Sequence, residues 1–284
     1  MTALNPPSLA LIDDLARRAL AEDLGEAGDI TTDSVIPADR QAAGVIAARK
    51  SGVAAGLPVA MRVFQLVDEN VRLAAKVEDG ARLVPGTVLL EISGAARSLL
   101  KAERVALNFL GHLSGVATAT AEIAAAIAHT KTRICCTRKT TPGLRALEKY
   151  AVRCGGGVNH RMGLYDMVLI KDNHIAAAGG VAQAIAAAKS FAPRGVKIEV
   201  EVDTLDQLDE ALAVGVDQIM LDNMGPDLLK TAVARVAGRS VTEASGSITK
   251  ATAAAVAEAG VDLISAGWIT HSAPCLDLGL DFTA

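Results

Sequence analysis

The chain has 284 residues, of which 51% are hydrophobic and 21% charged, an ordinary globular balance that excludes disordered, collagenous and low-complexity classes. Its 28 Lys and Arg against 32 Asp and Glu give a net charge of −4, and aromatic residues make up only 2%. A nucleic-acid module is therefore excluded, because such modules are normally basic and stack bases on aromatic side chains. At roughly 100 to 200 residues per domain, the length predicts two domains or one large one.

The N-terminal region and the cysteines are typical of a cytoplasmic protein. The first 20 residues show neither the basic head nor the apolar run of a signal peptide. Asn108 and His112 interrupt the apolar stretch 105–121, and no segment reaches the roughly 18 apolar residues of a membrane span. The four cysteines, of which Cys135 and Cys136 are adjacent, match neither a disulfide framework nor a CxxC motif. We therefore expect a cytoplasmic location and reduced cysteines with packing roles.

The first hundred residues predict a small α+β unit. Apolar residues at helical spacing predict a helix over 8–20, with Ser8 as its cap. Further expected elements are a helix over 58–68 and strands over 44–48, 71–77 and 87–92. The stretch 78–92 also has the pattern of a lipoyl-type hairpin, but no lysine lies at its turn, so we interpret it as a plain hairpin without a carrier role.

The rest of the chain predicts a parallel sheet. The pattern is helical from Arg97 to about Ala128, and strands then alternate with helices as far as Gly267. We expect strands over 133–136, 167–170, 197–200, 218–221, 241–244 and 262–265. The helices between them include 181–190, 205–214, 226–236 and 251–259. Such alternation specifies right-handed βαβ units, and six strands favour an incomplete or small α/β barrel.

Polar, charged or glycine residues follow every one of these strands. In a parallel barrel, side chains just past the carboxyl ends of the strands converge on one mouth. These positions hold Thr137-Arg138-Lys139, Lys171 to His174, Glu201 to Asp203, Asp222-Asn223, Ser245-Gly246-Ser247 and Ala266-Gly267-Trp268. The opposite strand ends carry mainly glycine and solvating residues, so this asymmetry predicts a functional site at the carboxyl ends.

Three carboxylates are expected to face the interior of the barrel. Strand alternation within IEVEVD places Glu199, Glu201 and Asp203 on one face, which is the inward face if the intervening apolar residues meet the helices. Candidate partners for them are the cations Arg138, Lys139 and Lys171, and a divalent metal held with Asp222. The alternative is an internal salt-bridge layer that only holds the barrel together, and Glu199, deepest in its strand, fits such a structural role best.

Two loops carry features of anion binding. The run Ser245-Gly246-Ser247-Ile248-Thr249 lies between a strand and a helix, so its backbone N–H groups and the helix N-terminus could hold a phosphate; ordinary turn chemistry is the alternative. His160 and Arg161 follow a triple-glycine loop, and an arginine can hold a carboxylate at two points. The alternatives are a packing histidine and a solvated charge, and Trp268 is interpreted as a packing residue.

These residues lie in long segments that resemble one family. The stretch TRKTTPGLRALEKYAVRCGGGVNHRMGLYDMVLIKDNHI, residues 137–175, resembles quinolinate phosphoribosyltransferases. The resemblance extends to DITTD at 29–33, ERVALNFLGHLSGVAT at 103–118, EVEVDTLDQL at 199–208 and IMLDNM at 219–224. It therefore covers most of the chain.

The resemblance implies a fold, a reaction and an assembly. The fold would be an N-terminal α/β sandwich over 1–105, joined by the tail 275–284, followed by an incomplete parallel α/β barrel over 106–274. The implied reaction transfers the phosphoribosyl group of phosphoribosyl pyrophosphate to quinolinate with Mg²⁺. Its products are nicotinate mononucleotide, pyrophosphate and CO2 in de novo NAD synthesis. A homodimer is also implied, with Arg104 donated across the interface.

The resemblance further assigns roles to the residues singled out above. Residues placed around the quinolinate carboxylates are Arg104, Arg138, His160, Arg161 and Lys171, with Thr137 beside them and Lys139 between the two substrates. Glu201 and Asp222 correspond to the acidic pair near the ribose and the metal, and Asp203 to a helper. The loops expected to bind the sugar phosphate are Ser245 to Ser247 and Ala266 to Trp268, supported by His271. The catalytic set would thus be Lys139, Lys171, Glu201 and Asp222.

Two departures and three alternatives accompany this assignment. Ser247 stands where many relatives have Gly or Asn, and Trp268 where a smaller aliphatic residue is usual. Within the same fold, the alternative is the related transferase-like protein of molybdenum-transport operons. From other classes, the alternatives are a barrel-shaped binding or scaffold protein that has lost catalysis, and a metal-dependent aldolase or isomerase. An aldolase or isomerase would not need so many cations around a carboxylate pair.

Overall fold

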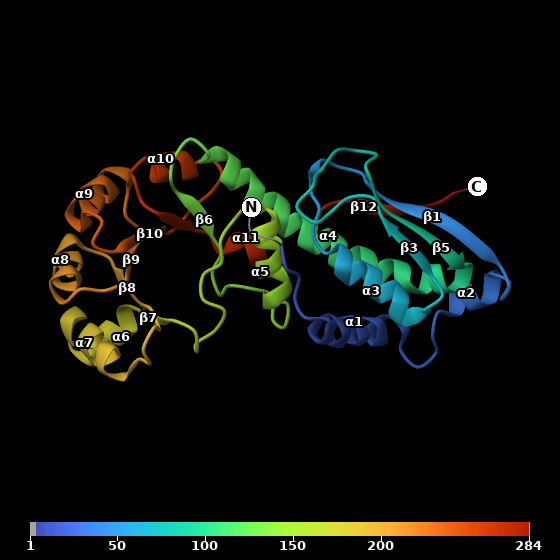
Figure 1. Ribbon diagram of the computed structural model, residues 1–284, viewed down its shortest axis with the longest axis horizontal. Helices are drawn as coiled ribbons and strands as arrows, with labels where there is room; N and C mark the ends of the chain where they lie inside the picture. Colours follow the sequence, from blue (N-terminus) through green and yellow to red (C-terminus); the bar gives the residue numbers. More distant parts are fainter. Residues whose placement is uncertain (1–3, 284) are drawn as a thin grey trace. The chain divides into compact units, whose positions relative to one another are not determined.

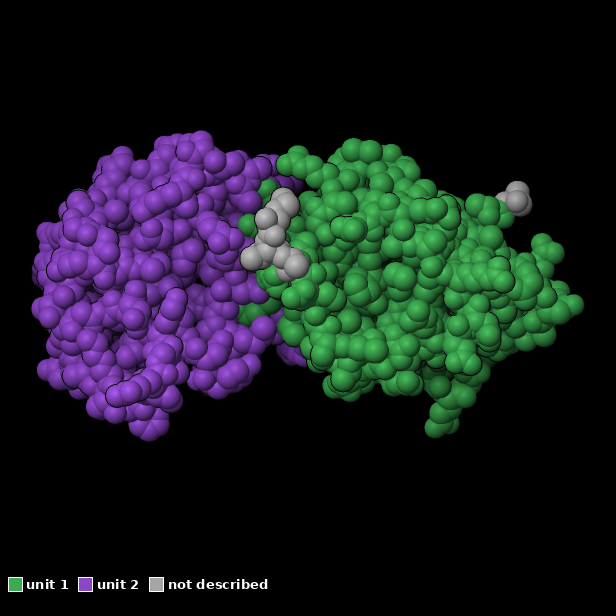
Figure 2. Space-filling view, in the orientation of Figure 1, with its two compact units in different colours: residues 1–121, 146–156, 272–284 green, residues 122–145, 157–271 purple. Residues whose placement is uncertain are grey.

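The computed structural model describes residues 4–283, and the chain divides into two compact units (Figure 2). Unit 1 comprises residues 1–121, 146–156 and 272–284, and unit 2 comprises residues 122–145 and 157–271. The domain boundary expected at 105/106 falls inside the long helix α4 (Ala96–Ala126), and the expected division of the chain stays a prediction.

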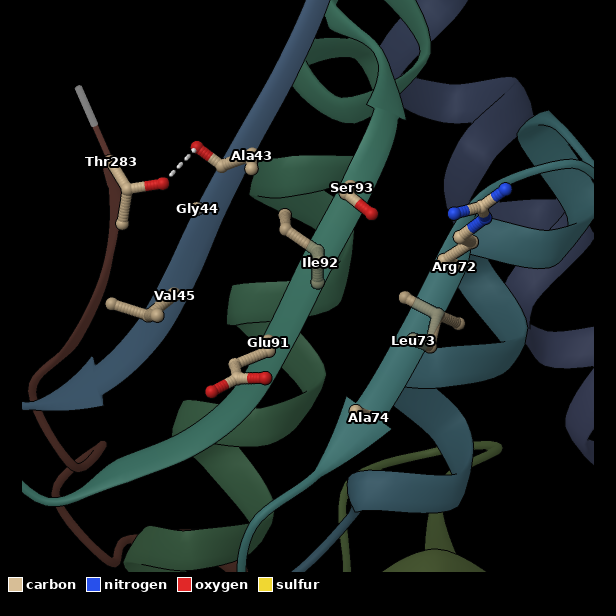
Figure 3. A pocket seen from close by; sticks show the side chains of 10 residues that line it. All are labelled: Ala43, Gly44, Val45, Arg72, Leu73, Ala74, Glu91, Ile92, Ser93 and Thr283. Carbon is tan, nitrogen blue, oxygen red and sulfur yellow. Dashed lines mark hydrogen bonds between the residues drawn. The ribbon is translucent and has the colours of Figure 1, made fainter.

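Unit 1 is built on an antiparallel sheet with the strand order β12-β1-β5-β3. The strands are β1 (Gln41–Ala48), β3 (Arg72–Ala75), β5 (Val88–Ala95) and β12 (Leu278–Phe282). A second, two-stranded sheet pairs β2 (Gly52–Val53) with β4 (Arg82–Leu83). Figure 3 shows a pocket on the larger sheet, lined by residues of β1, β3 and β5 and by Thr283, whose hydroxyl donates to the Ala43 carbonyl at 3.1 Å. The C-terminal segment is thus held beside β1.

The helices of unit 1 follow local sequence signals. They are α1 (Leu9–Leu24), α2 (Ile30–Val35), α3 (Leu57–Val67), α5 (Arg145–Cys154) and most of α4. The Ser8 side chain caps α1 as predicted, and Asp29 caps α2 by accepting the Thr32 N–H at 2.9 Å. Buried side chains of the unit's core include Phe64, Leu89, Leu90, Leu99, Leu110 and Leu113. The Ala-, Val- and Leu-rich composition therefore fills this core with few aromatic rings.

Helix α5 was not among the elements expected from the sequence, where only the glycines that follow it were interpreted, as a loop. Its Tyr150 hydroxyl donates to Asp79 at 2.8 Å, and Asp79 also accepts the N–H groups of Gly56 and Leu57 at the start of α3. Burial raises the pKa of the Cys154 thiol to about 12, which fits its expected packing role. Cys275 is exposed, so the packing role expected for it is wrong.

Unit 2 is an incomplete barrel of six parallel strands, as predicted (Figure 1). The strands are β6 (Arg133–Cys135), β7 (Val168–Ile170), β8 (Ile198–Val202), β9 (Gln218–Asp222), β10 (Val241–Ser245) and β11 (Leu263–Ser265). Their order in the sheet is β6-β11-β10-β9-β8-β7. The first two strands along the chain therefore form the two edges, with an isolated bridge from Cys135 to Val158 beside β6.

Helices cover the outer side of this curved sheet (Figure 1). They are α6 (Asp172–Ala178), α7 (Val181–Phe191), α8 (Leu205–Val214), α9 (Pro226–Val236) and α10 (Ala253–Ala257), whereas the short helix α11 (Trp268–His271) follows the last strand, β11, and lies apart from them (Figure 1). All six strands expected from the alternating pattern are confirmed, because short apolar runs between helical segments specify buried parallel strands. Among residues 4–283, no helix combines the length and the apolar character needed to cross a membrane.

Candidate active site

Unit 2 gathers most of the predicted site residues at one edge of its sheet. All six strands run parallel, so their carboxyl ends lie on the same side. The residues there are Thr137, Arg138 and Lys139 after β6, Lys171 after β7, Glu201 in β8, Asp222 at the end of β9, Ser245 at the end of β10 and Ala266 after β11. Arg104, in contrast, belongs to unit 1, where it is exposed on α4.

Arg138 and Arg161 are half-buried cations that influence one another. In the described part of the chain, the Nε of each guanidinium is buried without a hydrogen-bond partner. The Nη1 of Arg161 donates to the Met167 carbonyl at 3.0 Å, just before β7. Burial, and after it the charge of Arg138, lower the pKa of Arg161. Since buried donors without acceptors cost free energy and like charges repel, this pair indicates an anion site.

Lys171 and Glu201 form an ion pair across two neighbouring strands. The Lys171 Nζ lies 2.5 Å from the Glu201 Oε2, and β7 pairs with β8 in a register that brings these positions together. The Lys171 side chain is 46% exposed and that of Glu201 is 12% exposed. Because an ammonium carries three N–H donors, Lys171 can bind a further anion while it remains paired with Glu201.

A buried polar network lies inside the barrel. The His160 Nε2 is 2.8 Å from the Glu199 Oε2, and the Gln218 Nε2 donates to Glu199 Oε1 at 2.8 Å and to Glu243 Oε2 at 2.9 Å. Burial, followed by the charge of Glu199, raises the pKa of Glu243 to about 7. The structural role expected for Glu199 agrees with its complete burial in this network.

Close packing joins Lys139 to the segment after β11. A Cβ placed on Gly267 would lie 2.7 Å from the Lys139 Cδ, so a larger residue there would force the lysine side chain to move. The Thr270 hydroxyl donates to the Lys139 carbonyl at 2.7 Å, and the Lys139 N–H donates to the Thr137 hydroxyl at 2.9 Å. The structure thus fixes the backbone of Lys139 while its side chain remains exposed.

The Ser-Gly-Ser loop has an unusual backbone. Gly246 has φ 105° and Ser247 has φ 49°, and a Cβ on Gly246 would clash with the side chain of Asn223. Trp268 is half-buried, and its indole Nε1 donates to the Ile248 carbonyl at 2.8 Å, which supports its interpretation as a structural residue. The assigned helix after this loop, α10, begins at Ala253 and has five residues, but the turn that leads into it starts inside the loop, because the Ala253 N–H donates to the Thr249 carbonyl at 2.9 Å and the Thr252 N–H to the Thr249 hydroxyl at 3.3 Å.

Ser247 occupies a conformation that glycine and asparagine adopt more easily. This explains why those residues would suit the position, where the sequence departs from the family pattern. Replacing Ser247 by Gly is expected to raise the free energy of unfolding by up to about 1 kcal/mol, because it removes backbone strain at positive φ. Thermal unfolding would measure this, with the exposed Ser51→Gly as the control in which the midpoint stays unchanged or falls.

The remaining predicted residues lie near the barrel mouth without forming a ready-made ligand cage. Asp222 accepts from the Asn223 amide at 2.6 Å, while Asp203 and His271 are exposed. Among the described residues, three metal-ligating side chains converge only at His160, Glu199 and Glu243, a cluster without Glu201 or Asp222. Glu201 and Asp222 stand on neighbouring strands, a donor set of two carboxylates that suits Mg²⁺ completed by substrate phosphates and water.

Sequence reasoning missed part of the buried network. Glu243 is a carboxylate within the short, otherwise uncharged strand VTEAS, a signal that the prediction from alternating carboxylates around Glu199 did not use. Gln218 opens its strand beside Asp217 and gives no such signal. Only the register of β8, β9 and β10 places Gln218 where it can bond to both glutamates.

Comparison with known proteins identifies the family. Residues 29–114 match the model for the N-terminal domain of quinolinate phosphoribosyl transferase, and residues 116–281 match that for the C-terminal domain. The chain belongs to the quinolinate phosphoribosyl transferase family. The resemblance recognised in the sequence and the fold class expected from it are thereby confirmed.

Members of this family align along nearly the whole chain. The carboxylating nicotinate-nucleotide pyrophosphorylase of Mycobacterium leprae is 48% identical over 273 residues, covering 94% of this chain and 96% of that protein. The crystal structure of NadC from Streptococcus pyogenes superposes with a TM-score of 0.94 at 45% identity and covers 99% of this chain and 100% of that one. For nicotinate-nucleotide pyrophosphorylase from Francisella tularensis, the TM-score is 0.95 at 38% identity, with full coverage of both chains.

Proposed function

We propose that this protein transfers the phosphoribosyl group of phosphoribosyl pyrophosphate to quinolinate with loss of CO2, giving nicotinate mononucleotide and pyrophosphate. Its full-length similarity to carboxylating nicotinate-nucleotide pyrophosphorylases supports the reaction. The observation that carries the proposal is the pair of buried Nε atoms of Arg138 and Arg161. Quinolinate has two adjacent carboxylates on a pyridine ring, and two neighbouring guanidinium groups are the donors that bind such a dianion at several points.

The carboxylates on the neighbouring strands fit the second substrate. Glu201 and Asp222 would hold Mg²⁺ together with the pyrophosphate group, because Mg²⁺ commonly binds one or two protein carboxylates and keeps its other positions for phosphate and water. When bound, the ion neutralises charge on the departing pyrophosphate. Negative charge at Glu201 and Asp222 would also stabilise the positive character that develops at the ribose carbon as its bond to pyrophosphate breaks.

The other residues at the barrel mouth would orient the reactants. Lys139, fixed through its backbone, would reach between the two substrates, and Lys171 would offer its remaining donors to a carboxylate. Ser245 to Ser247 and Ala266 to Trp268 are proposed to hold the sugar phosphate, supported by His271. The ring nitrogen attacks the ribose carbon as its bond to pyrophosphate breaks, and the nitrogen becomes positively charged. This charge stabilises the electron pair left on the neighbouring ring carbon when its carboxylate leaves as CO2, and that carbon then takes a proton from solvent.

The proposal is tested by product release from purified protein. With quinolinate, phosphoribosyl pyrophosphate and Mg²⁺, we expect CO2 and pyrophosphate in equal amounts. Nicotinate in place of quinolinate should give neither product, and removal of Mg²⁺ with a chelator should stop the reaction until the ion is restored. If folded protein supplied with Mg²⁺ released no product from quinolinate, the proposal would be contradicted. A relative of the transport-operon protein or a non-catalytic binding protein would then be favoured.

We also propose a homodimer in which Arg104 completes the site of the neighbouring subunit. Its exposed position on α4 leaves the guanidinium accessible to a partner, and a third cation suits a dianionic substrate. A cytoplasmic location remains a prediction from the sequence.

A shared site has a specific consequence for mixed dimers. Arg104→Ala and Lys171→Ala chains should each be nearly inactive alone, and mixing them should restore up to about a quarter of the wild-type activity. The reason is that a hybrid dimer contains one site in which both residues are intact. Turnover after subunit exchange, confirmed with differently tagged chains, measures this. Exchange without any recovery would refute donation across the interface.

A further inference from the structure

His160 is held at both nitrogens of its ring. Its side chain is only 6% exposed. The backbone N–H of Arg161 donates to Nδ1 at 2.8 Å, and Nε2 lies 2.8 Å from the Glu199 Oε2. A backbone N–H can only donate, so Nδ1 must carry a lone pair, and the ring proton must sit on Nε2 and be given to Glu199. With the ring proton assigned in this way, the imidazole is neutral and has no N–H left for a substrate carboxylate.

The group that anchors Nε2 is itself fixed by three strands. Glu199 lies in β8, and its other oxygen accepts the amide of Gln218 in β9, which also donates to Glu243 in β10. All three side chains are buried. Through Nε2, the imidazole is hydrogen-bonded to a buried network. The register of the barrel strands, rather than solvent-exposed side chains, determines the geometry of this network.

The group that Nδ1 holds belongs to the anion site. The bond at Nδ1 fixes the backbone of Arg161, and the Arg161 Nη1 is fixed at its far end by the Met167 carbonyl at 3.0 Å. Between these two points lies the Arg161 Nε, which is buried without a hydrogen-bond partner and is proposed above to bind the dianion. The direction of this guanidinium therefore depends on the position of the His160 ring.

We propose that His160 is a positioning residue that connects the Glu199–Gln218–Glu243 network to the backbone of Arg161 and so aims the Arg161 guanidinium at a substrate carboxylate. This differs from the direct contact with quinolinate that the family resemblance implies for His160, and it rests on the proposed function. The neutral histidine fixes the backbone of Arg161 through hydrogen bonds, and the positive charge that binds the substrate carboxylate comes from Arg161.

The state of the ring can be measured on the wild-type protein. Labelling the five histidines with ¹⁵N and recording ring-nitrogen NMR spectra, with His160→Gln to assign the signal, distinguishes the two nitrogens. We expect a protonated Nε2 and an unprotonated Nδ1 for His160, both without quinolinate and at its saturation. A doubly protonated ring, or a proton gained at Nδ1 on adding quinolinate, would overturn the proposal.

A double-mutant cycle tests whether His160 acts through Arg161. His160→Gln keeps an amide donor within reach of Glu199 but lacks the Nδ1 acceptor. Calorimetric titration should show quinolinate affinity about tenfold weaker in this variant, with phosphoribosyl pyrophosphate affinity unchanged as the control for an intact site. In an Arg161→Ala background, the same substitution should have no further effect. A tenfold loss in both backgrounds would mean that His160 contacts the substrate itself, and the proposal would fail.

The two proposals fail separately. Wild-type protein that does not bind quinolinate would refute the proposed function, and the ring-nitrogen spectrum without ligand would still decide the role of His160. If His160→Gln does not fold, the spectrum of the wild-type ring in the two ligand states remains decisive, with the signal assigned through His160→Asn.

Discussion

Replacing Arg138 by Met is expected to weaken quinolinate binding by about 100- to 1000-fold and, at the same time, to raise the thermal unfolding midpoint. The loss of affinity follows from removing charge-assisted hydrogen bonds to a carboxylate, which contribute roughly 2–5 kcal/mol when one partner is truncated at a desolvated site. The gain in stability follows from removing the buried Nε and the repulsion that lowers the pKa of Arg161. Methionine fills most of the vacated volume with flexible apolar atoms.

The matched control is Arg133→Met, at the start of β6, the strand that Arg138 follows. Arg133 is exposed at the start of β6, so its replacement should leave both quinolinate affinity and the unfolding midpoint nearly unchanged. Titration calorimetry and thermal unfolding on the two variants measure both quantities. If Arg138→Met lowered the midpoint and kept the affinity, Arg138 would be a structural cation and the anion site would lie elsewhere. Opposite signs for affinity and stability are the signature of a group kept for binding.

The barrel was predictable because its strands are short apolar runs with periodic helices between them. Polar side chains at the strand ends then followed from topology alone, since parallel strands place their carboxyl ends together. The pairing of Lys171 with Glu201 is one result of this rule. Two contacts did not follow from it. The hydrogen bond from the Arg161 N–H to the His160 ring depends on local backbone geometry. The two hydrogen bonds from the Gln218 amide to Glu199 and Glu243 depend on strand register.

The least predictable elements were those whose signals conflict with their surroundings. Helix α5 precedes three glycines and was not among the elements expected from the sequence; in the structure it places Tyr150 against Asp79. The Ser247 backbone is a second case, because serine gives no sign of a positive φ. In both cases tertiary contacts determine the conformation, and a single sequence records them weakly.

Replacing Glu243 by Gln is expected to stabilise the protein increasingly as the pH rises from about 4.5 to about 7, reaching about 3 kcal/mol. In this window the folded chain keeps the Glu243 proton, because burial and the charge of Glu199 raise its pKa, whereas the unfolded chain releases it. The contribution of Glu243 to the free energy of unfolding of the wild type therefore falls as the pH rises, until Glu243 ionises in the folded state at about pH 7. Glutamine cannot ionise, so the variant escapes this loss and keeps a hydrogen-bonding side chain of the same size.

Denaturant unfolding at pH 5, 6, 7 and 8 measures the difference between variant and wild type, and Glu210→Gln on the exposed side of α8 provides the control with little pH dependence. A difference that stays constant across this range would show that Glu243 has the same charge in the folded and the unfolded chain. Because Glu243 reaches Glu199 through Gln218, a neutral Glu243 leaves Glu199 as the one carboxylate that the His160 N–H must satisfy. The charge of Glu243 is therefore coupled to the group that accepts the His160 N–H, and the His160 Nε2 itself lies only 3.8 Å from the Glu243 Oε2.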